Sequence, residues 1–322
     1  MKFEVDNEIK LEYLNTKPIQ TAKVDFYVLR TMDEYEDMVG KPVYNMSYQE
    51  LRQMIAMQFR NTSRGVVCKN VSIIKNYIDY CIKKNIVMHG ENRLSTFMSK
   101  DAPEFMDRKT LLGRFIDRDT LREYQKICYN EQDKLFLELL YVGVEGIKLR
   151  EITSLTIDAL DEENKMLTVD MGEGKFRRIS VEVFTMELIK DTYNQERYVE
   201  NNGEITDNIR LSAPRKSVIN KVGKYVFRVP GKKKFEAITN TLLGSRMRRI
   251  KKWVGNPYLT TKALRDSGMI QLAMDAYKEK GEVTKEDYQD ICDRFNYGTE
   301  SPDGYWALLR DTFEQYKELL GI

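Results

Sequence analysis

The sequence contains very little histidine and no paired cysteines. His89 is the single histidine in 322 residues, which excludes any mechanism that needs two imidazoles and any metal site with two histidine ligands. The four cysteines, Cys68, Cys81, Cys128 and Cys292, form no Cys-x-x-Cys pair and follow no metal-ligand spacing. We therefore predict that the protein binds no metal and no other cofactor, and that its thiols stay reduced in a cytosol.

Long apolar runs are also lacking. No window approaches the roughly 18 uncharged apolar residues of a transmembrane helix, and the acidic first residues lack the apolar core of a signal peptide. We therefore expect a cytoplasmic protein with no membrane partner. Apolar residues make up 42% of the chain and charged residues 32%, which is enough for a buried core below a well-solvated surface. A length of 322 residues favours two domains.

Charge is distributed unevenly along the chain. The 52 basic and 50 acidic residues give a net charge of only +2. Residues 208–265, however, contain 16 basic residues and one acid, Glu236, so the rest of the chain carries a net charge of −13. A region this basic, with apolar residues interleaved at helical spacing, favours a polyanionic partner, and we expect nucleic acid. The alternative is a solvated or disordered basic loop.

The apolar spacing of the first part predicts helices. A capping box at Ser47–Glu50 is typical of a helix start, and a stripe of apolar residues follows helical spacing from Val67 to Cys81. We predict a helical domain over residues 1–105, a linker over 106–117 and a second domain over 118–322.

The second domain combines helices with one β-hairpin. A capping box at Thr120–Glu123 predicts a helix start there. On both sides of Gly172-Glu-Gly174 the apolar period changes to two, which predicts an antiparallel hairpin of Met166–Met171 and Arg178–Val183. Further helices are predicted near Leu121–Cys128, Glu131–Val142, Lys148–Leu155, Val183–Arg197, Ile238–Val254, Thr261–Tyr277, Lys285–Phe295 and Trp306–Leu320. The predicted fold class is mainly α with a small antiparallel β-sheet (α+β).

Three short motifs follow one another in the second domain. Gly146–Leu155 reads Gly-Ile-Lys-Leu-Arg-Glu-Ile-Thr-Ser-Leu, the Gly172–Gly174 turn comes next, and Lys262-Ala-Leu-Arg265 precedes Tyr305. From about residue 115 to the end, their order and spacing resemble the phage integrase (tyrosine recombinase) family. The resemblance implies a two-domain, C-shaped clamp around duplex DNA, in which the first domain is similar to the family's core-binding domain.

The resemblance also implies a chemistry that this sequence is poorly equipped to perform. In the family, a tyrosine hydroxyl attacks a DNA phosphodiester while two arginines and His and Lys donors stabilise the charge at phosphorus. The positions that depart from this pattern are Lys148 for the first arginine, Glu173 for the turn lysine, Lys262 for the histidine of His-x-x-Arg and Tyr297 for the later histidine or tryptophan. Arg265 matches, and either Tyr305 or Trp306 occupies the nucleophile's position.

The number of changed groups decides the expected activity. Losing one preorganised charge donor typically slows catalysis by 100- to 1000-fold, about 3–4 kcal/mol. Since three or four are changed together, we predict a protein that is not an enzyme and retains DNA binding. Lys148, Lys262 and Arg265 would form a cationic pocket for one backbone phosphate. Arg265→Ala should then weaken binding to every DNA sequence and lower the salt dependence by about one counterion.

Two stretches carry the predicted DNA contacts, Arg60–Asn76 and the helix around Asn240–Lys252. Arginine pairs with guanine and asparagine with adenine in the major groove. The candidates in the first domain are Arg60, Asn61, Thr62, Arg64, Lys69, Asn70 and Lys75. Those in the second domain are Lys148, Lys175, Arg178, Asn240, Ser245, Arg246, Arg249, Lys252, Lys262 and Arg265, and Lys232, Lys233 and Lys234 would touch phosphates without discrimination. For each residue the alternative is a solvated helix face.

These observations predict a sequence-specific duplex-DNA-binding protein on an inactive recombinase scaffold, located at the nucleoid. The lost catalytic groups, with the resemblance, imply a transcriptional repressor of phage lytic genes that maintains lysogeny. One alternative is an active recombinase with Tyr305 as nucleophile and Lys148 and Lys262 as phosphate ligands; another is an accessory protein that gathers DNA sites. A homo-oligomer on DNA and an antagonist protein stay open as partners. The apolar stripe Tyr305–Leu320 fits either the domain's own core or a neighbouring protomer.

Overall fold

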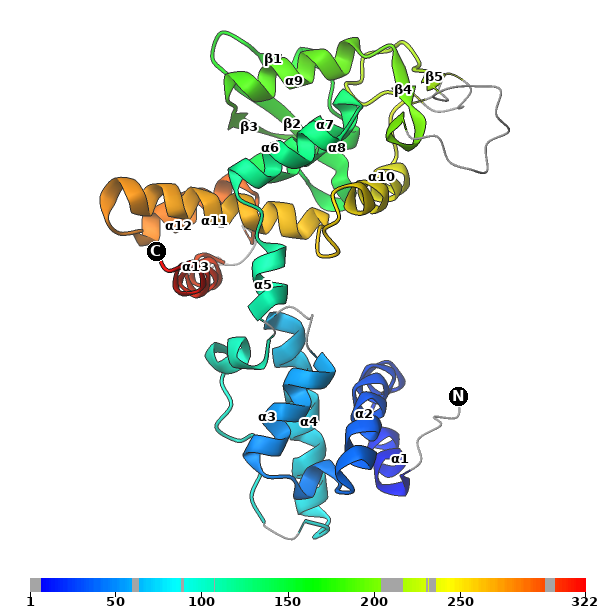
Figure 1. The fold of residues 1–322 in the computed structure, drawn as a ribbon, viewed down its shortest axis with the longest axis vertical. Coiled ribbons are helices and arrows are strands. Elements are labelled where there is room, and N and C mark those ends of the chain that lie inside the picture. Colours follow the sequence, from blue (N-terminus) through cyan, green and yellow to red (C-terminus); the bar gives the residue numbers. More distant parts are fainter. Residues whose placement is uncertain are drawn as a thin grey trace. The chain divides into compact units, whose positions relative to one another are not determined.

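The protein consists of two compact units, Met1–Leu112 and Gly113–Ile322, in a computed structural model. The structure describes residues 7–59, 64–87, 90–106, 108–203, 217–229, 231, 236–298 and 305–322. The boundary between the units falls within the predicted linker, 106–117, but this segment is not extended, because it contains helix α5 (Arg108–Arg114) (Figure 1). The clamp geometry implied by the resemblance stays a prediction.

The small unit is helical, as the apolar spacing predicts. Its elements are α1 (Glu8–Asn15), α2 (Ile19–Val39), the 3₁₀ turn η1 (Val43–Asn45), α3 (Tyr48–Phe59), α4 (Arg64–Lys83) and the 3₁₀ turn η2 (Ser99–Phe105). The capping box forms at the start of α3: the Glu50 amide donates to Ser47 Oγ at 3.3 Å, and the Ser47 amide donates to Glu50 Oε2 at 2.6 Å. The stripe of α4 from Val67 to Cys81 is buried against the neighbouring helices.

The large unit combines helices with two small antiparallel sheets, which confirms the predicted fold class. Its helices are α6 (Arg118–Ile127), α7 (Glu131–Val142), α8 (Arg150–Thr153), α9 (Val183–Asn194), α10 (Asn240–Trp253), α11 (Thr261–Lys280), α12 (Lys285–Arg294) and α13 (Trp306–Leu320), with 3₁₀ turns η3 (Ile147–Leu149), η4 (Ile157–Ala159) and η5 (Glu200–Gly203). One sheet has the order β1 (Leu160–Asp161), β2 (Met166–Gly172), β3 (Lys175–Ser180), and the other pairs β4 (Arg197–Val199) with β5 (Ser217–Ile219).

Several predicted boundaries in this unit are wrong. Helix α8 covers Arg150–Thr153 instead of Lys148–Leu155, because Lys148 and Leu149 have left-handed φ angles. Helix α9 ends at Asn194, and Arg197 belongs to strand β4 instead of the predicted helix Val183–Arg197.

Helix α6 starts three residues before Leu121, because Asp117 and not Thr120 caps it: the Asp117 carboxylate accepts the Thr120 amide at 2.7 Å. Strand β3 covers Lys175–Ser180 instead of Arg178–Val183. The hairpin closes directly after Gly174, so Arg177 and Arg178 belong to the paired strand, opposite Val169 and Thr168.

Helix α7 forms the centre of the large unit. Its side chains from Gln132 to Val142 are buried except for Lys134, and α9 and α11 pack against it (Figure 1). The contact with α11 is made close by Gly268, where a Cβ atom would lie 1.9 Å from the carbonyl oxygen of Tyr141. The two helices therefore meet at backbone distance.

The last three helices share a second apolar core. Helices α11, α12 and α13 lie together (Figure 1), and Leu309, Phe313 and Tyr316 of the C-terminal stripe are buried among them. The inner part of the stripe is thus the core of this unit, while Tyr305 and Leu320 at its ends are exposed. Within the described ranges, no helix has the length and apolar character needed to span a bilayer.

Candidate nucleic-acid interface

The first motif folds into a tightly held turn between α7 and α8. Gly146 has a φ of +67°, and a Cβ there would lie 2.7 Å from Cγ of Glu151, so glycine is required. The Glu151 carboxylate is fully buried, and Arg177 of β3 binds both of its oxygens, with Nε–Oε1 and Nη2–Oε2 distances of 2.7 Å. The same guanidinium donates to the Gly143 carbonyl oxygen at 2.6 Å. Gly146 and Glu151 therefore have a structural role: they hold the turn that carries the motif's cations.

The cations of the motif lie on the outside of this turn. Lys148 and Leu149 have φ angles of +55° and +61°, in the left-handed region that few non-glycine residues adopt. Lys148 is exposed, and no ion pair joins it to another side chain in the described part of the molecule. Arg150 is also exposed and pairs with Asp170 of β2 at 3.0 Å. Lys148 is therefore accessible to an external anion.

Arg265, the position that matches the family, is already occupied by carboxylates. Its Nη1 donates to Glu145 Oε2 at 3.1 Å, and its Nη2 donates to Asp266 Oδ1 at 2.9 Å. The ring of Tyr297 covers the guanidinium, with its centroid 5.1 Å from Cζ. The side chains of Arg265 and Glu145 are only 19% and 20% exposed, so this cluster is largely shielded from water.

The electrostatics of this cluster correct the prediction of a cationic pocket. Burial lowers the pKa of Arg265, but the Asp266 and Glu145 carboxylates outweigh burial and raise the pKa overall. Burial raises the pKa of Glu145 against the opposing effect of Arg265. One arginine with two carboxylates carries a net negative charge when all three are ionised. Lys262 is exposed and has no ion pair within the described residues, so it does not neutralise them.

Two tyrosines lie beside this cluster. The rings of Tyr297 and Tyr305 pack with centroids 5.0 Å apart, and the Tyr305 ring lies so close to Gly298 that a Cβ there would be 1.5 Å from Cδ2 of the ring. Trp306 instead packs under two cations, Lys285 at 5.2 Å and Arg310 at 5.3 Å from its ring. Tyr305 therefore packs on the tyrosine that covers Arg265, whereas Trp306 contacts other cations.

The hairpin turn presents an acid at its tip. Glu173 is exposed with a φ of +54°, and Gly174 follows with +74°, which places both residues in the left-handed region of a tight turn. Lys175 is exposed beside them, and Arg178 pairs with Asp161 at 2.9 Å. Phe176, on the outer face of β3, is 65% exposed. The turn thus offers one unpaired cation, Lys175, among the described residues.

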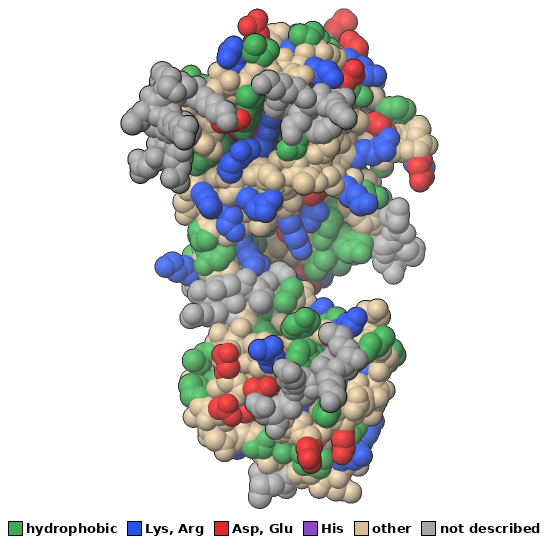
Figure 2. Space-filling view, turned by 90° about the vertical axis from the view of Figure 1, so that its right-hand side faces the viewer, with side chains coloured by type: hydrophobic (Ala, Val, Ile, Leu, Met, Phe, Trp, Pro, Cys, Tyr) green, Lys and Arg blue, Asp and Glu red, His purple; other side chains and the backbone are tan. Residues whose placement is uncertain are grey.

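Helix α10 carries the basic surface predicted from the sequence. Its N-cap is Thr239, whose hydroxyl accepts the Leu242 amide at 3.3 Å, and its apolar face buries Leu243 and Ile250. Figure 2 looks onto the side of the large unit where α10 lies, and Lys and Arg side chains gather across the middle of that face. The polar residues of α10 that are exposed or half-buried are Asn240, Thr241, Ser245, Arg248, Arg249, Lys251 and Lys252. This surface suits a DNA backbone.

Arg246 does not belong to that surface, which corrects the prediction that it reads the major groove. The residue is 6% exposed and points into the unit. Its Nη1 donates to Gln132 Oε1 at 2.9 Å and lies 3.9 Å from Asp133 Oδ1, while the ring of Tyr198 stacks on the guanidinium at 4.3 Å. Burial raises the pKa of Asp133 against the opposing effect of Arg246. Arg246 therefore ties α10 to α7 and β4.

Comparison with known families identifies the scaffold. Residues 115–315 match the family described as MrpR, C-terminal catalytic domain, and residues 4–83 match MrpR, N-terminal core-binding domain. The chain belongs to the MrpR family. These two domain matches confirm the resemblance to phage integrases that the three motifs predict.

This MrpR-family chain is similar to a prophage-derived protein and, more distantly, to solved recombinase and integrase structures. The chain is 23% identical over 301 residues, 92% of its length and 90% of the relative, to YopR of Bacillus subtilis (strain 168), an SPbeta prophage-derived uncharacterized protein. YopR comes from an SPbeta prophage, which agrees with the likeness to SPbeta-type prophage proteins that the changed motif positions and the chain length indicate. Among solved structures, XerA recombinase gives a TM-score of 0.41 at 12% identity, covering 97% of this chain and 98% of XerA. A Tn1549 transposon integrase in complex with circular intermediate DNA gives 0.42 at 13%, covering 94% and 98%.

The predicted DNA contacts of the MrpR core-binding domain differ in their exposure and in their hydrogen bonds. Arg60, Asn61 and Thr62 lie outside the described residues, as do Lys232–Lys234 of the other domain. Lys69 is exposed on α4, whereas Arg64 and Lys75 donate to the Ser99 and Ser95 carbonyl oxygens at 3.1 and 3.0 Å. Asn70 is 8% exposed on the inner face of α4, so the prediction that it contacts bases is wrong for this conformation.

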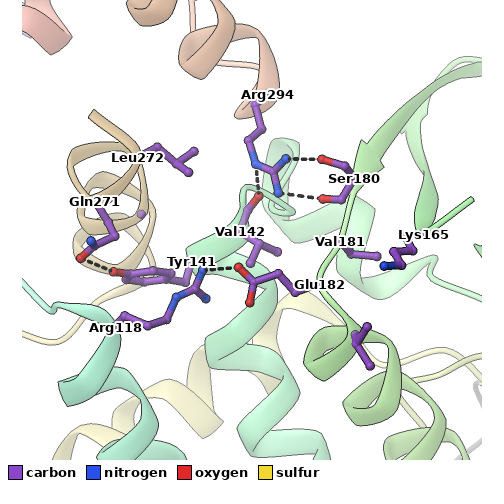
Figure 3. Close-up of a pocket in the computed structure, with 12 residues that line it drawn as sticks. Arg118, Tyr141, Val142, Lys165, Ser180, Val181, Glu182, Gln271, Leu272 and Arg294 are labelled. Atoms are coloured by element: carbon purple, nitrogen blue, oxygen red, sulfur yellow. Dashed lines mark hydrogen bonds and ion pairs between the residues drawn. The ribbon is translucent and has the colours of Figure 1, made fainter. Parts of the chain in front are cut away.

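A cleft of about 500 Å³ opens elsewhere on the catalytic domain (Figure 3). Arg118 and Arg294 come from different elements to line it, but Arg118 pairs with Glu182 at 3.1 Å and Arg294 donates to the Ser180 and Val142 carbonyl oxygens at 2.8 and 3.1 Å. None of the residues lining the cleft was predicted as a DNA contact. No group of three or more His, Cys, Asp or Glu side chains within the described ranges is arranged to hold a metal ion.

Sequence reasoning missed three residues of the interface. Arg248 is exposed on α10 and donates to Ser245 Oγ at 3.0 Å, and its spacing of three from Ser245 was a signal that it shares the polar face. Glu145 and Asp266 were missed as partners of Arg265. Asp266 is adjacent in sequence, but Glu145 is 120 residues away, and no local pattern connects it to Arg265.

Proposed function

We propose that this MrpR-family protein is a non-catalytic, sequence-specific duplex-DNA-binding protein that represses transcription of phage lytic genes and so maintains lysogeny. The observation that carries the proposal is a contrast between two features of the large unit. Arg265 is occupied by Glu145 and Asp266, whereas the exposed face of α10 is rich in basic residues. The first feature opposes strand cleavage, and the second favours a DNA backbone.

The electrostatics of the Arg265 cluster oppose strand cleavage. Attack of a tyrosine on a phosphodiester adds negative charge to phosphorus, so the site must present unengaged donors to the phosphate oxygens. Here the guanidinium of Arg265 donates to two carboxylates, and each carboxylate would repel the phosphate. Lys148 and Lys262 are exposed point charges without the planar fork that binds two phosphate oxygens at once.

Helix α10 supports sequence-specific binding. The exposed polar side chains of α10 include the amide of Asn240 and the cations of Arg248 and Lys252, the chemistry that distinguishes base edges and holds phosphates. The prophage origin of YopR, at 23% identity, supports phage genes as the target. A nucleoid location in the cytoplasm follows from this proposal.

A nicked suicide substrate tests the absence of catalysis. In such a duplex, a strand cut by a tyrosine releases a short fragment and leaves protein covalently attached to DNA. We expect no covalent adduct with wild-type protein. An adduct that Tyr305→Phe abolishes would overturn the proposal.

Selection and reporter assays test repression. Fragments of duplex DNA retained by the purified protein at near-physiological salt should share a sequence motif. A promoter that carries this motif should be repressed in the presence of the protein and active in its absence. Bound fragments without a common motif, or a promoter that is bound and not repressed, would instead favour an accessory protein that gathers DNA sites.

The competing function is an active recombinase. The observation in its favour is Tyr305, which is 42% exposed and lies beside Tyr297 next to Arg265. On this hypothesis DNA would first have to displace Glu145 from the guanidinium. The suicide substrate distinguishes the two functions, because only the recombinase forms an adduct.

A further inference from the structure

The Arg265 cluster has the geometry of a phosphate site whose ligand is supplied by the protein. A guanidinium binds a phosphodiester through parallel N–H donors directed at two anionic oxygens. In this structure Nη1 is directed at a Glu145 oxygen, and Nη2 and Nε are directed at an Asp266 oxygen, at 3.1, 2.9 and 3.2 Å. Three of the five guanidinium N–H groups are therefore engaged by carboxylate oxygens.

Glu145 is held in this position by a second layer of contacts. Its backbone amide donates to Glu151 Oε2 at 3.0 Å, and Arg177 fixes that carboxylate from the other side at 2.7 Å. The following residue, Gly146, has a φ of +67° and makes the sharp turn that lies against Glu151. The backbone of Glu145 is therefore fixed by buried hydrogen bonds, which hold its side chain against Arg265.

The burial of the pair makes displacement costly. Both side chains are about four-fifths shielded, and Tyr297 covers the guanidinium. A DNA phosphate that approached Arg265 would have to replace Glu145, and Asp266 would repel it at close range. The exposed cations nearby in sequence, Lys148 and Lys262, are under no such restriction.

We propose that Glu145 and Asp266 act as an internal substitute for a DNA phosphate at Arg265, and that they remove one backbone contact from the protein's binding to any duplex. This inference rests on the proposed function, since it assumes that the protein binds duplex DNA. On this inference, the two carboxylates lower the affinity of the protein for duplex DNA of any sequence. It also replaces the expectation, drawn from the sequence, that Arg265 anchors a phosphate.

The test is a set of charge-neutral variants measured by salt titration on a random-sequence duplex. Glu145→Gln with Asp266→Asn should tighten binding roughly 5- to 10-fold at about 0.1 M salt and steepen the dependence of log Kd on log salt by about 0.9, the value for one additional phosphate contact. Glu145→Gln alone should give part of this gain. Adding Arg265→Ala to the double variant should remove it, while Arg265→Ala in the wild-type background should change affinity less than about 2-fold.

A matched control separates a local effect from a general change in charge. Glu162→Gln with Asp191→Asn also removes two negative charges from the surface of the same unit, and Glu162 also pairs with a cation, Lys190 at 2.9 Å. This control should leave the salt dependence unchanged. If the double variant loses thermal stability, a second measurement is the binding of inorganic phosphate to its folded fraction at low temperature. Binding is followed by broadening of the ³¹P signal. The signal should broaden with the double variant and should stay sharp when Arg265→Ala is added.

Two outcomes would overturn the inference separately from the proposed function. Wild-type binding to duplex DNA with an unchanged affinity and salt dependence in the double variant would overturn the inference alone. A gain that persists after Arg265→Ala would do the same, because the phosphate would then bind elsewhere. Wild-type protein that ignores duplex DNA even at about 0.05 M salt would overturn the proposed function, and the inference with it.

Discussion

The guanidinium of Arg177 meets the carboxylate of Glu151 edge to edge, with two N–O distances of 2.7 Å, and Glu151 is fully buried. This pair joins the motif at Gly146 to the hairpin strand β3, and it supports Glu145 through the backbone amide of that residue. This buried charged pair thus supports the site, and its effect should be seen in stability.

Glu151→Gln should lower the free energy of unfolding by about 3–5 kcal/mol, because it leaves the charge of Arg177 without its buried partner. Urea denaturation measures this change. Asp170→Asn, which breaks the exposed pair with Arg150, is the matched control and should cost less than about 1 kcal/mol. Equal losses of unfolding free energy in the two variants would contradict the conclusion that the Glu151 pair is buried and the Asp170 pair exposed.

Gly268→Ala should destabilise the large unit by about 3 kcal/mol or more. A methyl group at this position would lie 1.9 Å from the Tyr141 carbonyl oxygen, so α7 and α11 would have to separate. Gly244→Ala is the control on α10, where no atom lies within 4 Å of the added methyl group. Because alanine favours a helix interior, this second variant should gain about 0.5–1 kcal/mol. Thermal denaturation of both variants measures the contrast, and a well-tolerated Gly268→Ala would refute the close packing.

Arg246 and Arg248, two residues apart on α10, should respond to mutation in opposite ways. Arg246→Met removes the cation facing buried Asp133 and should cost about 3 kcal/mol of stability. Arg248→Ala should leave stability unchanged, weaken binding to all duplexes and lower the salt dependence by about 0.9. Chemical denaturation together with salt titration checks both. Loss of stability in Arg248→Ala and not in Arg246→Met would reverse the assignment of the two faces.

DNA binding should tighten as the pH falls from about 7 towards 4.5, the ordinary pKa of a glutamate. Burial raises the pKa of Glu145, so this residue takes up a proton at a higher pH than an exposed glutamate, and its neutral form releases Arg265. The groups that face Glu145 are Arg265, Asp266 and Glu151, and Tyr297 covers the arginine. Anisotropy titrations at several pH values measure the effect.

The control for this pH dependence is Glu145→Gln, which removes the titrating group. Other carboxylates also gain protons over this range, so the prediction concerns the difference between wild type and variant. The wild type should gain more affinity than the variant between the two pH limits. Parallel curves for the two proteins would show that Glu145 does not control Arg265.

Local patterns predicted the helices well where a helix carries its own signals. Residues Glu131–Val142 and Trp306–Leu320 are helical over the predicted ranges because apolar residues recur at helical spacing there. The start of α6 was misplaced because Asp117 and Thr120 are both good caps, and the choice depends on one side-chain contact with the Thr120 amide. The inward position of Arg246 was missed although it shares a face with Leu243 and Ile250, because an arginine is expected at the surface unless a buried partner is known.

The sequence by itself determined the helical character, the hairpin, the basic segment and the departures from the recombinase motifs, since each depends on residue type and on spacing along the chain. Only the tertiary structure decided that Arg265 is occupied and that Arg246 is internal. In both cases the deciding partners, Glu145 and Gln132, are more than 100 residues away in sequence, and they meet their arginines only because the packing of α7, α10 and α11 brings distant side chains together. The sequence shows which side chains are charged, whereas the fold decides which partners those side chains contact.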